Sequence, residues 1–224
     1  MKKKNAKTIL VALGTLAAFA LWTFLIRCVD VQPIGPNGSR VGFAAINGAF
    51  HALTGVHWAL YTLTDWLGLV PIGIALGFAV LGLVQLIRRK SLLKVDRDIL
   101  ILGGFYIVVL AAYLLFETVV INFRPVLIDG KLEASYPSST TMLALCILPT
   151  AMMQLKTRIR SDAVRCAILG ILAAFTVFMV VGRLISGVHW LTDVLGGVLL
   201  GAALTAAYAG VVARLDAAKA AKAD

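Results

Sequence analysis

The last third of the chain holds an arginine, a histidine and an aspartate whose spacing suits phosphate chemistry. His189 follows Arg183 by six residues, and Asp193 follows His189 by four. On a helix, positions i and i+4 share a face, so Asp193 is expected to accept a hydrogen bond from one imidazole nitrogen of His189. This bond would fix the tautomer, leave the other nitrogen with a free lone pair and stabilise the cationic ring. A histidine held in this way is a competent nucleophile towards phosphorus.

Two earlier segments add groups that bind anions. Ser138 and Ser139 stand where a helix is expected to begin, and free backbone N–H groups and the positive end of the helix dipole gather there. Arg124 precedes Pro125, which ends a helix, and the planar guanidinium of arginine matches phosphate oxygens. Each segment also has a structural interpretation, as helix caps, an interfacial arginine or a polar network between helices. The three segments together favour the chemical interpretation.

Transmembrane helices are the elements that must position these residues. The chain has 224 residues, a mean hydropathy of +0.93 and only 14% charged residues. Crossing the hydrocarbon core of a bilayer takes about 20 helical residues. Six uncharged apolar stretches approach this length, and we expect each to span the membrane: Thr8–Ile26, Trp66–Ile87, Ile99–Phe116, Ala134–Leu155, Cys166–Gly182 and Val194–Ala213.

A further uncharged stretch, Val41–Thr64, contains polar residues on one helical side and apolar residues on the other. We expect an amphipathic helix that lies at the membrane interface in the first outer loop. A seventh span here would move the basic run that begins at Arg88 to the outer side, which argues against it. The predicted fold is therefore an all-α bundle of six transmembrane helices, with residues 1–224 as a single domain.

The distribution of basic residues predicts the orientation. With the N-terminus inside and six spans, 16 of the 21 lysines and arginines fall in the inner segments. This asymmetry follows the positive-inside rule and accounts for the net charge of +10 without a nucleic-acid partner. The first apolar run lacks a small-residue cleavage pattern, so we expect a retained helix. We predict an integral protein of a bacterial cytoplasmic membrane, with both termini cytoplasmic and the three chemical segments outside.

Together the three segments resemble the PAP2 superfamily, the type 2 phosphatidic acid phosphatases and related haloperoxidases. The family pattern is a lysine seven residues before Arg-Pro, then Pro-Ser-Gly-His, then Ser-Arg with five residues to His and three more to Asp. The resemblance runs from Glu117 to Asp193. It implies that His189 forms a phosphohistidine with Asp193 as its partner. It also implies that the phosphate is bound by Arg124, Ser138, the N–H of Ser139 and Arg183.

Three positions depart from the family pattern. Gly182 stands where the family has a serine, Glu117 replaces the lysine, and Thr140 replaces the histidine that protonates the leaving group. We expect Glu117 to pair with Arg124 or Arg183, which would weaken the phosphate clamp. Loss of a general acid typically costs roughly 10²–10⁴-fold in rate.

This loss affects substrates unequally, because an alcohol leaving group needs a proton whereas a phosphate leaving from a diphosphate is already a weak base. We therefore predict a phosphatase or phosphotransferase for a lipid phosphate or isoprenoid diphosphate that favours the diphosphate. Arginines would neutralise the charge, so no metal or other cofactor is expected. Glu117 is an alternative proton donor, and His51 and His57 are further candidates to reach the site.

Two other classes of protein compete with this prediction. A non-catalytic PAP2-like protein that binds lipid phosphates is favoured by Glu117 and Thr140. A small transporter or channel would need polar residues along several mid-spans, and the spans here are nearly free of them.

Overall fold

The structure is a computed structural model and describes residues 2–220. In that range the chain is all-α, as predicted, with two short 3-10 helices and isolated bridges between the α-helices. The α-helices are α1 (Lys2–Cys28), α2 (Ala44–Thr54), α3 (Trp58–Leu67), α4 (Leu69–Arg89), α5 (Arg97–Thr118), α6 (Ser139–Arg158), α7 (Asp162–Ile185) and α8 (Leu191–Ala220). The 3-10 helices are η1 (Pro36–Gly38) and η2 (Leu92–Lys94).

Five of the six predicted spans coincide with helical segments that are long and apolar enough to cross a membrane. These segments, found among the described residues, are Lys7–Cys28, Trp58–Arg89, Arg97–Thr118, Asp162–Ile185 and Leu191–Ala218. The remaining predicted span, Ala134–Leu155, overlaps α6, but its first five residues belong to the preceding loop. Helix α6 also carries threonines, a glutamine and two basic residues, which make it less apolar than the other five.

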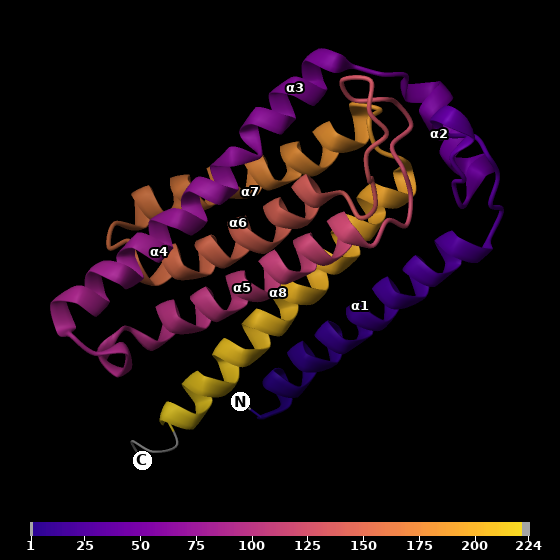
Figure 1. The fold of residues 1–224 in the computed structure, drawn as a ribbon. Helices are drawn as coiled ribbons and strands as arrows, with labels where there is room; N and C mark the ends of the chain where they lie inside the picture. The colour runs from indigo at the N-terminus through magenta and orange to yellow at the C-terminus, as the bar shows by residue number, and fades with distance from the viewer. Residues whose placement is uncertain (1, 221–224) are drawn as a thin grey trace.

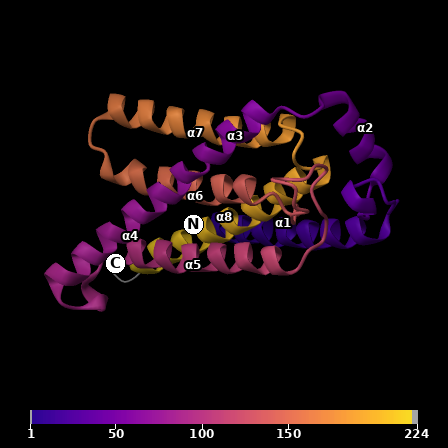
Figure 2. The same ribbon diagram turned by 45° about the horizontal axis from the view of Figure 1, so that its top comes forward.

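Helix α6 lies inside the bundle, in contact with α4, α5, α7 and α8 (Figures 1 and 2). Its polar residues are satisfied by protein groups. Thr150 donates to the carbonyl of Cys146 at 2.7 Å, and Gln154 donates to the hydroxyl of Tyr208 at the same distance. A helix surrounded by other helices does not need a lipid-compatible surface, so its polarity fits its central position.

The amphipathic stretch Val41–Thr64 is not one helix, so its predicted extent is wrong. Helix α2 covers Ala44–Thr54 and ends at Gly55, whose φ of +67° breaks the helix at a conformation that glycine adopts without strain. Helix α3 then starts at Trp58 and runs with α4 as one segment of 32 residues. The second half of the predicted amphipathic helix therefore belongs to the second span.

The two ends of the bundle differ (Figure 1). The start of α1, the end of α8 and the α4–α5 and α6–α7 connections lie at one end. Helix α2, the loop between α5 and α6 and the turn between α7 and α8 lie at the other. The three segments singled out by their chemistry therefore meet at one end of the bundle.

Candidate functional site

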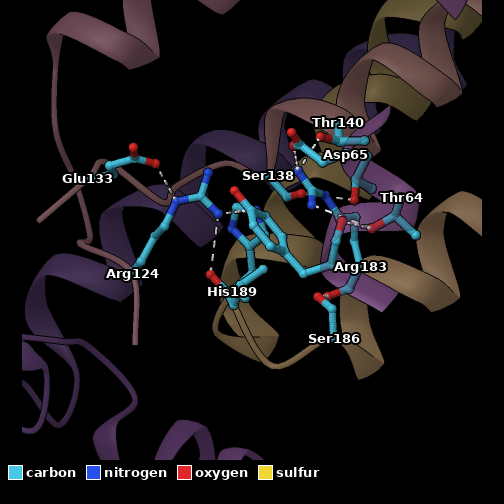
Figure 3. Close-up of polar contacts among 12 residues, drawn as sticks. Thr64, Asp65, Arg124, Glu133, Ser138, Thr140, Arg183, Ser186 and His189 are labelled. Atoms are coloured by element: carbon cyan, nitrogen blue, oxygen red, sulfur yellow. Dashed lines mark hydrogen bonds and ion pairs between the residues drawn. The ribbon is translucent and has the colours of Figure 1, made fainter. Parts of the chain in front are cut away.

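Two arginines flank His189 at this end of the bundle (Figure 3). Arg124 comes from the α5–α6 loop, Arg183 from the last turn of α7, and His189 from the turn that precedes α8. Nη1 of Arg124 lies 3.2 Å from Nε2 of His189. His189 and Arg183 are buried, with 3% and 2% of their surface exposed, and Arg124 is 9% exposed. A buried cluster of two guanidinium groups and an imidazole is suited to hold an anion.

The hydrogen bonds of His189 define its tautomer. Nδ1 lies 3.1 Å from the backbone carbonyl of Ser135, which can only accept, so Nδ1 carries the proton. Nε2 then presents its lone pair to Arg124. Burial, followed by the charges of Arg124 and Arg183, holds the pKa of His189 well below its usual value, and the Ser135 carbonyl opposes this shift. The ring is therefore neutral near pH 7, with Nε2 available as a nucleophile.

The predicted direct bond between His189 and Asp193 is wrong, and a serine bridges the two. Helix α8 begins at Leu191, so His189 precedes the helix and the i, i+4 geometry does not apply. The hydroxyl of Ser135 lies 3.1 Å from Nδ1 of His189 and donates to Oδ2 of Asp193 at 2.5 Å. Asp193 also accepts from Asn122 Nδ2 and from the Trp190 N–H, each at 3.0 Å. The carboxylate thus acts on the imidazole through Ser135.

The sequence assigned no role to Ser135 or Asn122, although both lie close to residues that its pattern singled out. Asn122 is two residues before Arg124, and Ser135 is three residues before Ser138. The only available signal was the presence of polar residues in a short loop that already held an expected phosphate ligand.

Arg183 has four protein partners at its guanidinium, and the longest contact is from Nη1 to Thr64 Oγ1 at 3.5 Å. Its Nη2 donates to Thr140 Oγ1 at 2.7 Å and to Asp65 Oδ1 at 3.0 Å, and its Cζ lies 5.1 Å from the centre of the Tyr61 ring. Its Nε is buried and has no hydrogen-bond partner in the described part of the chain. Thr140, at the position of the family's histidine, therefore contacts the buried arginine directly.

The expected pairing of Glu117 with an arginine is also wrong. Arg124 instead pairs with Glu133, whose Oε2 lies 3.1 Å from Nε, and Arg183 pairs with Asp65. Glu117 is exposed near the end of α5 and makes no ion pair with either arginine in residues 2–220. Because α5 ends at Thr118, Arg124 does not continue its helical face, and the assumed alignment is lost.

The two serines at the start of α6 lie in different surroundings. Ser138 is fully buried, its N–H donates to the backbone carbonyl of Asp193 at 2.9 Å, and its hydroxyl bonds with that of Thr141 at 3.0 Å. Ser139, the first residue of α6, lines a cavity. Both lie in the predicted place, but only Ser139 faces open space.

A cavity of about 1070 Å³ connects the two arginines with the apolar faces of α4, α5 and α6. Its polar end contains Tyr61, Asp65, Arg124, Thr140 and Arg183, with Glu117 and Glu133 near them. Its apolar part is lined by Leu69, Ile72, Leu76, Val109, Leu110 and Ile147. A second, almost wholly apolar cavity of about 510 Å³ continues between α4 and α5 and shares Ala79, Tyr106 and Leu110. The combination suits a molecule with a charged head and an apolar tail.

Helix α2 and the segment after it support the turn that carries His189. His51 Nε2 lies 3.1 Å from the carbonyl of Gly187, and the N–H of His57 donates to the carbonyl of Ser186 at 3.0 Å. Gly187 has a φ of +71°, and a Cβ there would lie 1.9 Å from the carbonyl oxygen of Gly55. The two histidines therefore contact the turn, and neither lines the cavity beside the arginines.

The structure also explains the glycine at position 182. A Cβ on Gly182 would lie 2.7 Å from Cγ2 of Thr64. The Thr64 side chain thus occupies the space that the family's serine would need.

An all-helical membrane bundle with a histidine between two arginines defines a class of phosphate-handling membrane proteins. The family model of the PAP2 superfamily matches residues 11–216, and the chain belongs to this superfamily. Its fold is similar to that of the first transmembrane PAP2 type phosphatidylglycerolphosphate phosphatase from Bacillus subtilis, with a TM-score of 0.55 and 23% sequence identity. The similarity covers 91% of this chain and 96% of the other. No curated protein matches the chain in sequence.

Proposed function

We propose that the protein is a membrane phosphatase or phosphotransferase that acts on a lipid phosphate or isoprenoid diphosphate through a phosphohistidine on His189. The observation that carries this proposal is the position of the buried His189, whose Nδ1 faces the Ser135 carbonyl at 3.1 Å and whose Nε2 faces the guanidinium of Arg124 at 3.2 Å. An imidazole lone pair held beside positive charge is the arrangement that attack on a phosphoryl group needs.

The proposed reaction has two steps. Phosphate oxygens replace Glu133 on Arg124 and Asp65 on Arg183, and Arg124 leaves Nε2 as it binds an oxygen. Nε2 then forms a bond to phosphorus while the bond from phosphorus to the leaving oxygen breaks, and the ring becomes cationic. Asp193 stabilises this cation through the Ser135 hydroxyl. In the second step, water or another acceptor attacks the phosphorus and releases the neutral imidazole.

The cavity supports a lipid substrate, because it joins the charged end to an apolar groove beside α4 and α5. The Bacillus subtilis protein is named as a phosphatase of a lipid phosphate, which agrees with this class of substrate. Thr140 cannot protonate a leaving alcohol as an imidazolium does, so a diphosphate is the favoured substrate. Ser139 places a backbone N–H at the start of α6, where it would bind a phosphate oxygen.

The topology that accompanies this function has six spans. We propose that α6 crosses the membrane with the five apolar helices, that α2 lies at the interface, and that residues 1–224 form one domain. Basic residues at the end opposite His189, such as Arg88, Arg89 and Arg158, favour that end as cytoplasmic. Both termini are then inside a bacterial cytoplasmic membrane, and the site faces outward.

A non-catalytic protein that binds lipid phosphates is the second candidate. It is favoured by the carboxylate that each arginine already holds, Glu133 on Arg124 and Asp65 on Arg183, and by Thr140. In such a protein the arginines would bind the headgroup without turnover.

Turnover by the purified protein in detergent distinguishes the two candidates. The parent and His189→Ala are assayed with farnesyl monophosphate and farnesyl diphosphate, and the phosphorylated protein is trapped by acid-free quenching. We expect phosphate release from both substrates, faster from the diphosphate, an acid-labile phosphoprotein in the parent, and neither in His189→Ala. Binding of both lipids without release or phosphoprotein would favour the second candidate.

A further inference from the structure

The carboxylate of Asp65 lies beside Thr140, which occupies the position of the family's proton-donating histidine. Building on the function proposed above, we infer that Asp65 is the catalytic acid that protonates the leaving oxygen. An alcohol that leaves phosphorus needs a proton, and a carboxyl group within reach of the bound phosphate is one of the groups that supplies it. Asp65 belongs to α3, outside all three segments whose spacing suggested phosphate chemistry.

One nitrogen links Asp65 with Thr140. Nη2 of Arg183 donates to Thr140 Oγ1 at 2.7 Å and to Asp65 Oδ1 at 3.0 Å, so the two side chains meet at the same end of the guanidinium (Figure 3). Thr140 has no acidic proton to give near neutral pH, whereas Asp65 has a carboxyl group. The Asp65 side chain is 56% exposed and lines the cavity, so a bound substrate can reach it.

The other carboxylates of the cavity are placed less well for this role. Glu133 pairs with Arg124, the arginine that covers Nε2 of His189, and so lies nearer to the attacking atom than to a leaving oxygen. In an in-line displacement the leaving oxygen departs on the opposite side of phosphorus. Glu117 makes no ion pair with either arginine in the described range of the chain. Asp65 is the carboxylate attached to the second arginine, away from the nucleophile.

Substrate binding would change the surroundings of Asp65. In the free protein Asp65 is paired with the positive charge of Arg183, with Tyr61 next to them and Arg124, Glu117 and Glu133 elsewhere in the cavity. A phosphate that binds Arg183 removes this cation from Asp65 and places negative oxygens beside it. Asp65 then lies beside the bound phosphate instead of Arg183, a position from which a carboxyl group can give a proton to a leaving oxygen.

Nε2 of His189 forms its bond to phosphorus, the phosphorus–oxygen bond breaks, and the Asp65 proton moves to the departing oxygen. In the second step the Asp65 carboxylate accepts a proton from the attacking water, which restores the acid. Because the phosphate that leaves a diphosphate is a weak base and needs no proton, monoesters react more slowly than diphosphates but still react.

The test compares two substrates that share one tail, farnesyl monophosphate and farnesyl diphosphate. The leaving group is an alcohol in the first and a weakly basic phosphate in the second. Asp65→Asn keeps the size of the side chain and removes the proton. We expect it to lower kcat for the monophosphate about 10²-fold or more and kcat for the diphosphate less than about 3-fold. The rival donor is tested by Glu117→Gln, which we expect to keep the parent's ratio between the two substrates.

Each other outcome has a defined meaning. An equal loss on both substrates would show that Asp65 only positions Arg183, and an unchanged kcat on both would show that it has no role; either result overturns the inference and leaves the proposed function intact. If Glu117→Gln selectively lowered kcat for the monophosphate, Glu117 would be the proton donor. A parent without turnover, or His189→Ala with parental turnover, would overturn both the inference and the proposed function.

Discussion

Two sides of the site are built in opposite ways: the side of His189, the proposed nucleophile, and the side of the cavity. On the nucleophile side, His189, Ser135, Asp193 and Asn122 are all buried and joined by consecutive hydrogen bonds. On the cavity side Glu133 and Asp65 are partly exposed, and each holds an arginine that a phosphate would also bind. The first side is preorganised, and the second is arranged to exchange partners. Changes on the first side should therefore slow every substrate, and changes on the second should redistribute activity among substrates.

The largest expected effect comes from Arg183, because its charge acts on His189 and its guanidinium holds Asp65 and Thr140. Arg183→Lys keeps the positive charge but loses the planar fork that bonds Thr140 and Asp65. Loss of one preorganised donor to a developing oxyanion typically costs about 10²–10³-fold in kcat. Steady-state kinetics should show this loss for monophosphate and diphosphate alike. A loss confined to the monophosphate would mean that Arg183 acts mainly by placing Asp65.

Ser135→Ala breaks the link between His189 and Asp193 on the nucleophile side. We expect about a 10–10²-fold loss of kcat on both substrates. The cationic ring would lose the hydroxyl that links it to the Asp193 carboxylate, but it would keep the bond from Nδ1 to the backbone carbonyl. Ser135→Thr, which keeps a hydroxyl, should recover part of the loss. Rapid-quench measurement of phosphohistidine formation provides the readout, and equal rates in parent and Ser135→Ala would exclude a relay.

The pH dependence of kcat/KM gives a third comparison. The pKa of His189 is lowered by burial, Arg124 and Arg183, so the neutral form persists below the ordinary imidazole value of about 6.5. Activity should decrease only as the pH falls through this lowered pKa. Arg124→Gln removes a positive neighbour, which raises the pKa and moves the acidic limb of the profile to higher pH. An acidic limb at the same pH in both proteins would assign it to another group.

A smaller effect is expected from Glu117→Lys on the cavity side. The change replaces a carboxylate that lines the cavity and holds neither arginine with the positive charge of the family pattern. We expect KM to fall a few-fold for the dianionic monophosphate and kcat to change little. The two constants are measured separately at low and high salt, since an effect of an exposed charge should weaken as salt screens it.

The sequence predicted the bundle and the place of the site better than the bonds within it. Uncharged stretches and basic turns are local signals, and five of the six predicted spans coincide with helical segments of the described residues that are apolar enough to cross a membrane. The i, i+4 argument failed because it assumed a helix that begins only at Leu191. It could not show that the hydroxyl of Ser135, 54 residues before His189, fills the gap. Such contacts depend on the packing of loops between helices.

Asp65 had a weak signal that sequence analysis did not use. It is the sole aspartate, glutamate, lysine or arginine between Val41 and Ile87. A lone carboxylate at the start of a long apolar segment is costly near the membrane and usually has a partner. That partner is Arg183, 118 residues further along the chain. The sequence could not identify it, because the pairing depends on the packing of α3 against α7.

The groove between α4 and α5 has a consequence for how the protein would tell lipids apart. Several of its lining residues, including Leu76, Leu83, Ile107 and Leu110, are more than half exposed, so the groove is open along its side. A groove that is open along its side does not limit the length of the hydrocarbon tail that it binds. The protein would then distinguish its lipid substrates by the atoms near phosphorus. We expect it to turn over prenyl diphosphates of increasing length at similar rates.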